Sequence, residues 1–144
     1  MTSVGQRGPG PGAPRLLVVE DDPPLGETVE QVLAEAGYAV TRSASGAEAL
    51  RLARALAPDL ILLDVRLPDV SGLAVLDRLA VDEQTRATPV ILWTAAATHE
   101  VGLWRERLAG RRVGFLPKPF RVADLLAALA SELGRPDLAD QITR

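Results

Sequence analysis

Between residues 15 and 134, short apolar runs alternate with longer segments that have the period of an amphipathic helix. Three of the five runs lack polar interruptions, which indicates strands that are covered on both faces. Strands and helices that alternate in this way form βα units around a parallel sheet. We therefore predict an α/β fold with a doubly wound five-stranded parallel sheet and five helices. The expected strands are residues 16–19, 38–42, 60–63, 90–93 and 113–116.

The helical segments carry their own boundary signals. Asp22 is placed to cap a helix that begins at Pro23, and Gly37 is placed to end it. Ser45 and Glu48 have the spacing of a capping box at the start of a second helix. The other helices are expected after Ser71, over about residues 98–109, and along the apolar stripe Val122, Leu125, Leu126, Leu129 and Leu133.

A length of 144 residues predicts one domain with a short segment before it and another after it. Residues 1–14 are half Gly or Pro and are expected to be a disordered arm, 15–134 form the domain, and 135–144 form a short tail. The sequence contains no apolar segment of membrane-spanning length and no recognisable secretion signal, so we expect a cytoplasmic protein without a membrane partner. A net charge of −3 argues against direct nucleic-acid binding, and the absence of cysteine excludes disulfides and thiolate metal sites.

Charged and hydroxyl side chains follow four of the predicted strands. The C-terminal ends of parallel strands share one edge of the sheet, and ligands bind there. Glu20 and Asp21 follow the first strand, Asp64 the third, Thr94 the fourth and Lys118 the fifth. Three carboxylates at adjacent strand ends repel one another unless a cation or protons intervene. Their all-oxygen character favours Mg²⁺, with Mn²⁺ as an alternative, over zinc.

Lys118 is the only lysine in a chain that has fifteen arginines. A compact ammonium and the hydroxyl of Thr94 are groups that phosphoryl oxygens bind besides a metal ion. The simpler interpretation of Lys118 is a surface charge, and that of Thr94 is a cap at a strand end. Their convergence on one edge with the carboxylates favours a phosphate-binding site.

Four motifs in chain order resemble those of bacterial two-component response regulators, in their receiver domain. They are the runs LLVVEDD, which ends at Asp22, DVRLPDVSG, which begins at Asp64, WTA around Thr94 and FLPKPF around Lys118. The resemblance covers about residues 15–134 and implies a flavodoxin-like fold with strand order 2-1-3-4-5. It implies a receiver of the single-domain type, since residues 135–144 are too few for an output domain.

The resemblance implies a metal-dependent phosphoacceptor. Asp64 would accept a phosphoryl group from the phosphohistidine of a sensor histidine kinase or of a histidine phosphotransfer protein. Asp21, Asp64 and the main-chain carbonyl of Arg66 would bind Mg²⁺ directly, and Glu20 would act mainly through water. The side chain of Arg66 could also shield the acyl phosphate from water, and its alternative is a solvated surface charge.

The resemblance also implies a switch. Thr94 and Lys118 would each bind a phosphoryl oxygen, and the Lys118–Pro119 peptide bond would be cis. Movement of Thr94 toward the phosphoryl group would vacate space for Phe115, which changes the surface that a downstream protein reads. Plain core packing is the competing interpretation of Phe115. The motifs identify neither the downstream target nor the oligomeric state, and a homodimer stays open.

Three functions remain as hypotheses. The first is a stand-alone receiver, a switch that catalyses its own phosphorylation and dephosphorylation rather than a turnover enzyme. The second is a receiver-like interaction module that binds a partner independently of phosphorylation. The third is a flavin or nucleotide binder on the same fold, against which the lack of a Gly-rich loop after the first strand argues.

Overall fold

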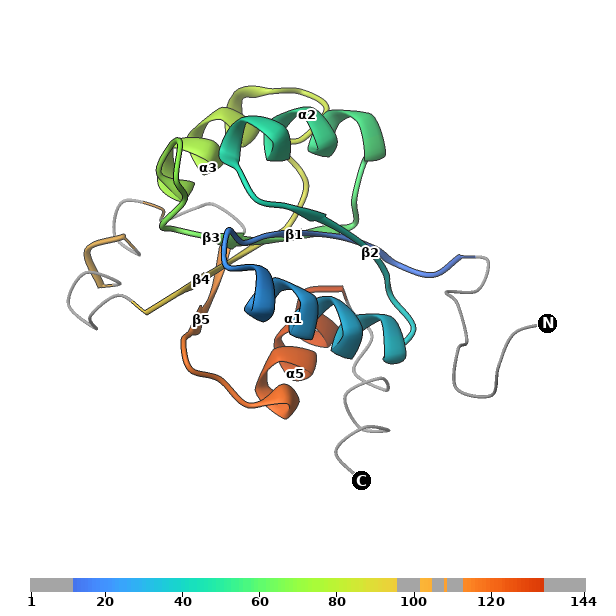
Figure 1. Cartoon of the computed structure of the whole chain (residues 1–144). Helices are drawn as coiled ribbons and strands as arrows, with labels where there is room; N and C mark the ends of the chain where they lie inside the picture. The colour runs from blue at the N-terminus through green and yellow to red at the C-terminus, as the bar shows by residue number, and fades with distance from the viewer. Residues whose placement is uncertain (1–11, 96–101, 105–107, 109–112, 134–144) are drawn as a thin grey trace.

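A parallel sheet of five strands forms the centre of the computed structural model, which describes residues 12–95, 102–104, 108 and 113–133 (Figure 1). Helices precede and follow its strands in alternation, as the sequence predicts. The strands are β1 (Arg15–Val19), β2 (Ala39–Ser43), β3 (Leu60–Asp64), β4 (Val90–Thr94) and β5 (Val113–Pro117), and the helices with full bounds are α1 (Pro23–Glu35), α2 (Gly46–Leu56), α3 (Gly72–Val81) and α5 (Val122–Leu133).

The strand order is β2-β1-β3-β4-β5, and every neighbouring pair is parallel. This confirms the predicted order and all five strands. The second strand is displaced by one residue from the prediction, because Tyr38 belongs to the connection from α1. Its N–H donates to the carbonyl of Leu33, and its ring lies in the core. Gly37 makes this turn possible with a φ of 100°, a value that side chains with a Cβ rarely adopt.

Both faces of the sheet are covered, which confirms the doubly wound architecture. Helices α1 and α5 lie on one face, and α2 and α3 lie on the other (Figure 1). Successive strand residues divide between the two cores, as Val18 packs toward α1 and α5 and Leu17 toward α2 and α3. Burial on both faces is why the runs in β1, β3 and β4 contain no alternating polar residues.

The predicted helix starts are confirmed, with one correction. Asp22 accepts a hydrogen bond from the N–H of Leu25, and Ser45 accepts one from the N–H of Glu48. The reciprocal half of the capping box does not form, because the N–H of Ser45 donates to the Ser43 hydroxyl instead. Ser71 caps α3 by accepting from the N–H of Leu73.

Two further helix predictions differ from the structure or fall outside it. Val122 does not join the buried stripe of α5, since it lies in the first turn and is 49 % exposed. Of the helix predicted over residues 98–109, the structure describes a helical segment at 102–104 and a turn at Leu108, and the rest lies outside the described residues. In the parts of the chain that are described, no helix combines the length and apolar character needed to cross a membrane.

Candidate functional site

Three carboxylates meet at the C-terminal edge of the sheet, where the sequence predicts them. Glu20 and Asp21 follow β1, and Asp64 ends β3. One oxygen of each lies within 4.8 Å of the others. Glu20 and Asp64 are buried, whereas Asp21 is exposed to solvent. Carboxylates that are this close and this buried require positive charge or protons between them.

Lys118 supplies that positive charge. Its Nζ lies 2.5 Å from Oε1 of Glu20 and 3.0 Å from Oδ2 of Asp64. Its backbone N–H donates to the carbonyl of Thr94, which fixes the chain after β5 against the end of β4. The Lys118–Pro119 bond is cis, as predicted. The chain's only lysine is therefore part of the acidic cluster rather than a surface charge.

Trp93 is a site residue that the sequence analysis treated only as part of a strand. Its side chain is fully buried, and the Lys118 ammonium lies 4.5 Å from the centroid of its ring. The indole N–H donates to the carbonyl of Val19, the residue that precedes Glu20. A large aromatic in a central strand ordinarily indicates core packing, so its position directly before Thr94 was the only available signal.

Asp64 is held in place by the loop that follows it. The N–H of Arg66 donates to Oδ1 of Asp64 over 3.0 Å. Helix α3 begins so close to β3 that a Cβ on Gly72 would lie 2.2 Å from the carbonyl oxygen of Asp64, so only glycine fits there. The N–H of Gly72 donates to the carbonyl of Val65, which closes the loop. The contacts of Gly72 fix the backbone of the loop, and the hydrogen bond from Arg66 orients the carboxylate.

The other predicted site residues lie on or directly after the strands that form the site. Thr94 is buried at the end of β4, one residue beyond the register partner of Asp64. Phe115 is half-buried on β5 and packs against the core on the α2 and α3 face. The N–H of Arg66 contacts Asp64, as described above. The roles predicted for Thr94, Phe115 and the Arg66 carbonyl remain predictions.

The electrostatics of the cluster raise two pKa values. Burial, together with the neighbouring Asp64, raises the pKa of Glu20 to about 7, although the hydrogen bond from Lys118 opposes the rise. For Lys118, burial lowers the pKa, but the hydrogen bonds to Glu20 and Asp64 outweigh it and leave the pKa above its usual 10.5. The ammonium therefore stays charged at neutral pH, while Glu20 is poised to exchange a proton.

We predict that Glu20 makes the metal-free protein less stable as the pH rises. Its pKa in the folded state is about 7 against 4.5 for the free side chain, so between these values the folded state keeps a proton that the unfolded state has lost. The stabilisation is complete below pH 4.5 and is lost as the pH rises through about 7. Thermal unfolding in EDTA should show a steeper decline of Tm over this range for the unsubstituted protein than for Glu20→Gln. Equal slopes would contradict the prediction.

Asp69 has a structural role that the sequence analysis missed. Its carboxylate accepts hydrogen bonds from the N–H groups of Gly46 and Ala47, over 2.8 and 3.0 Å, and so connects the loop after β3 to the N-terminus of α2. These bonds lower the pKa of Asp69 below its usual 3.8. Without coordinates, the residue is indistinguishable from an ordinary loop charge, because the partners lie 23 and 22 positions away.

Asp69→Asn is expected to lower the Tm at pH 7, because the amide loses the negative charge that the helix N-terminus favours. The folded-state pKa of Asp69 is depressed, so its stabilisation is present above about pH 3.8 and is lost as the pH falls through the folded-state value. The Tm difference from the unsubstituted protein should therefore shrink in acid. Glu83→Gln, which neutralises an exposed loop carboxylate, is the matched control and should leave the Tm nearly unchanged.

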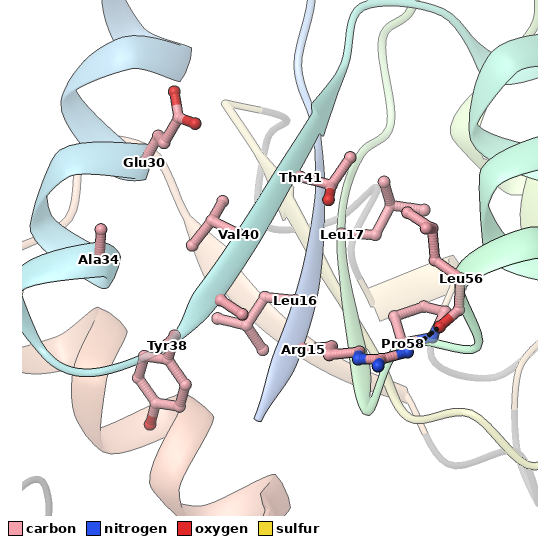
Figure 2. Close-up of a pocket in the computed structure, with 11 residues that line it drawn as sticks. Arg15, Leu16, Leu17, Glu30, Ala34, Tyr38, Val40, Thr41, Leu56 and Pro58 are labelled. Carbon is pink, nitrogen blue, oxygen red and sulfur yellow. Dashed lines mark hydrogen bonds between the residues drawn. The ribbon is translucent and has the colours of Figure 1, made fainter. Parts of the chain in front are cut away.

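A hollow of about 440 Å³ lies at the opposite end of the same strands, beside the starts of β1 and β2 (Figure 2). Its lining is mainly apolar, and its charged groups are engaged with the protein. Arg15 donates to the carbonyl of Leu56, and Glu30 forms an ion pair with Arg42 over 3.1 Å. The hollow therefore lacks the converging polar groups of the acidic cluster, which remains the candidate site.

Comparisons with known proteins agree with this geometry. The family model described as the response regulator receiver domain matches residues 16–130. The transcriptional regulator RpaA of Synechocystis is 37 % identical over 134 residues, which are 91 % of this chain and 54 % of RpaA. The response regulator DivK of Brucella ovis is 38 % identical over 120 residues, 83 % of this chain and 95 % of DivK. The chain thus spans about half of RpaA and nearly all of DivK.

Solved structures give the same result. The receiver domain of the sensor histidine kinase PA1611 from Pseudomonas aeruginosa is 34 % identical with a TM-score of 0.76, over 85 % of this chain and 99 % of that one. It is described with a magnesium ion coordinated in its active site cleft. The chemotaxis protein CheY4 of Vibrio cholerae is 29 % identical with a TM-score of 0.77, over 85 % of this chain and 100 % of that one. The chain belongs to the receiver domain family of the response regulators of two-component systems.

Proposed function

We propose that Asp64 accepts a phosphoryl group in a Mg²⁺-dependent reaction, from a histidine kinase or a histidine phosphotransfer protein. Receiver domains as a family are phosphorylated by these proteins and bind Mg²⁺ in an acidic pocket. The observation that carries the proposal is the contact of Lys118 Nζ with Oδ2 of Asp64, inside a cluster of three carboxylates. A carboxylate beside both a metal-binding cluster and a fixed cation is equipped to receive an anionic group.

Glu20, Asp21 and Asp64 would hold the metal ion. They offer only oxygen atoms, which lie within 4.8 Å of one another, so one ion could bind Asp21 and Asp64 directly and Glu20 mainly through water. When bound, Mg²⁺ neutralises charge on the transferring phosphoryl group. We assign the main-chain carbonyl of Arg66 as a further ligand. The N–H of the same residue donates to Asp64 and keeps its carboxylate oriented. Asp21 is the exposed member, so it offers the ion an entrance from solvent.

In the proposed reaction, a carboxylate oxygen of Asp64 attacks phosphorus in line with the P–N bond of the phosphohistidine. The new P–O bond forms as the P–N bond breaks, and the electron pair returns to the imidazole nitrogen of the donor. Lys118 exchanges its contact with Asp64 for one with a phosphoryl oxygen, and the Thr94 hydroxyl donates to another. The protein supplies position and charge, since phosphoryl transfer needs little other chemistry from it.

The signal would then pass to a partner protein. Thr94 ends β4 and Phe115 lies in the neighbouring strand β5, so the two residues belong to adjacent strands beside the site. Movement of Thr94 toward the phosphoryl group would allow Phe115 to repack, and the surface around β5 and α5 would carry the change. A phosphorylation-controlled signalling switch is the function that this arrangement supports best.

Phosphorylation by a small donor tests the proposal without the cognate kinase. Phosphoramidate with Mg²⁺ should add one phosphoryl group per chain by intact mass, and EDTA should prevent the addition. Hydroxylamine should remove it, as expected for an acyl phosphate. A protein that stays unmodified, both with phosphoramidate and with the histidine kinases of its host, would instead be a phosphorylation-independent interaction module.

A further inference from the structure

Lys118 carries its charge on a flexible four-carbon stem, so its position depends on what surrounds it. Two of its contacts are with Glu20 and Asp64, and both of these carboxylates are proposed metal ligands. Each contact therefore weakens when Mg²⁺ binds or when Asp64 is phosphorylated. The contact with the ring of Trp93, at 4.5 Å from its centroid, involves neither the metal nor the phosphoryl group.

Trp93 is itself held rigidly. It is fully buried in β4, which lies between β3 and β5, and its indole N–H donates over 3.3 Å to the carbonyl of Val19. The ring of Phe120 packs beside it at 5.7 Å between centroids and an angle of 57°. The indole therefore cannot rotate away when the carboxylates change partners. We therefore expect the same ring face to meet Lys118 in each state of the site.

We propose that Trp93 is a positioning residue for the phosphoryl transfer, because its ring face holds the Lys118 ammonium beside Asp64 while Glu20 and Asp64 take up other ligands. This inference rests on the proposed function of the site. The ring of tryptophan attracts a cation more strongly than that of any other side chain, and the attraction grows where water is excluded. An aliphatic residue would fill the same space in β4 without holding the ammonium.

A fluorinated tryptophan series separates this role from core packing. Fluorine withdraws electron density from the ring face and weakens its attraction for a cation, while the shape of the side chain hardly changes. The chain has two tryptophans, so a Trp104→Phe background confines the label to Trp93. The rate of phosphorylation by phosphoramidate should fall progressively with the number of fluorines, to about fivefold slower for the most fluorinated protein.

Lys118→Met provides the matched control. Without the ammonium, the same fluorine series should give no trend in rate. Fluorination also makes the indole N–H a better donor to Val19, so it strengthens this hydrogen bond while it weakens the contact with the ammonium. A rate that falls with fluorination would therefore result from the weaker cation–π contact and not from the hydrogen bond. A flat series in the protein that keeps Lys118 would overturn the inference, since a residue that only fills space would behave in that way.

A second measurement does not depend on phosphorylation. Because Lys118 is the only lysine, protein labelled with ¹³C-lysine gives one ε-methylene signal in NMR spectra. The ring of Trp93 should shift its protons upfield, Trp93→Phe should keep part of the shift, and Trp93→Leu should abolish it. A signal at the position of a solvated lysine in the unsubstituted protein would overturn the inference. Failure of the unsubstituted protein to be phosphorylated would contradict the proposed function instead, and this signal would still decide whether Trp93 holds the ammonium.

Discussion

Asp64→Asn is expected to abolish phosphorylation by phosphoramidate, because a neutral amide is not a nucleophile toward phosphorus. The substitution keeps the size of the side chain, and its amide oxygen can still accept the hydrogen bond from the N–H of Arg66. The fold should therefore persist, as circular dichroism and thermal unfolding would show. Intact mass after incubation with phosphoramidate and Mg²⁺ measures the effect, and no phosphorylated species should be detected.

Asp59→Asn is the matched control. Asp59 directly precedes the same strand, β3, at the opposite edge of the sheet, and its carboxylate accepts a hydrogen bond from the N–H of Arg15. Its substitution should leave the rate of phosphorylation unchanged. Modification of Asp64→Asn at the normal rate would place the acceptor elsewhere. Peptide mapping would then identify it, with the exposed Asp21 of the same cluster as the first position to examine.

Much of the fold follows from the sequence because its signals are local. An uninterrupted apolar run indicates a strand that is buried on both faces, and this is how β1, β3 and β4 are recognised. Capping is local as well, so Asp22, Ser45 and Ser71 mark three helix starts correctly. The order of the strands is not local, and here it came from the resemblance to receiver domains.

The errors occur at helix starts, where one element meets the next. Glu48 has capping-box spacing, but Ser43 reaches the N–H of Ser45 first. Val122 fits the apolar period of α5, but the helix begins there, and its first turn is only partly covered. Both outcomes depend on how one element meets the next. The spacing of residues within a single element does not contain that information.

The acidic cluster was predictable for a topological reason. The C-terminal ends of parallel strands share one edge of the sheet, and the strand order that the resemblance implies places β1 beside β3. Glu20, Asp64 and Lys118 were therefore expected to lie near one another. The contacts of Trp93 and Asp69 were not predictable in this way. They require that particular side chains meet across strands, or across a loop and a helix, and only tertiary packing decides this.

The buried ion pairs of Lys118 with Glu20 and Asp64 are an inefficient way to stabilise the fold. The free-energy cost of removing charges from water can exceed the stabilisation from their mutual attraction. Replacement of buried ion pairs by apolar residues is therefore often neutral or stabilising. Lys118 and its two buried carboxylates are therefore better explained by chemistry than by folding. A substitution at Lys118 separates these explanations, because it removes the cation while the apolar cores stay intact.

Lys118→Met is expected to slow phosphorylation by about 10²–10³-fold, the loss found when a single oriented donor to a developing oxyanion is removed. The methionine side chain keeps most of the length of the lysine stem and can lie against Trp93. Glu20 already has its pKa raised to about 7, so it can take up a proton when its cation is lost, and the protein should still fold. Rates with phosphoramidate at saturating Mg²⁺ measure the effect.

Two further measurements show whether loss of the positive charge causes the slower phosphorylation. Mg²⁺ should raise the Tm of Lys118→Met more than that of the unsubstituted protein, because the carboxylates that Lys118 had neutralised then depend on the metal alone. Lys118→Arg keeps the charge but replaces the compact ammonium by a planar guanidinium. Its phosphorylation rate should therefore lie between those of the unsubstituted protein and Lys118→Met. A Lys118→Met protein that binds Mg²⁺ and is phosphorylated at the normal rate would show that the ammonium only balances charge, since the metal and Asp64 would then suffice for the transfer.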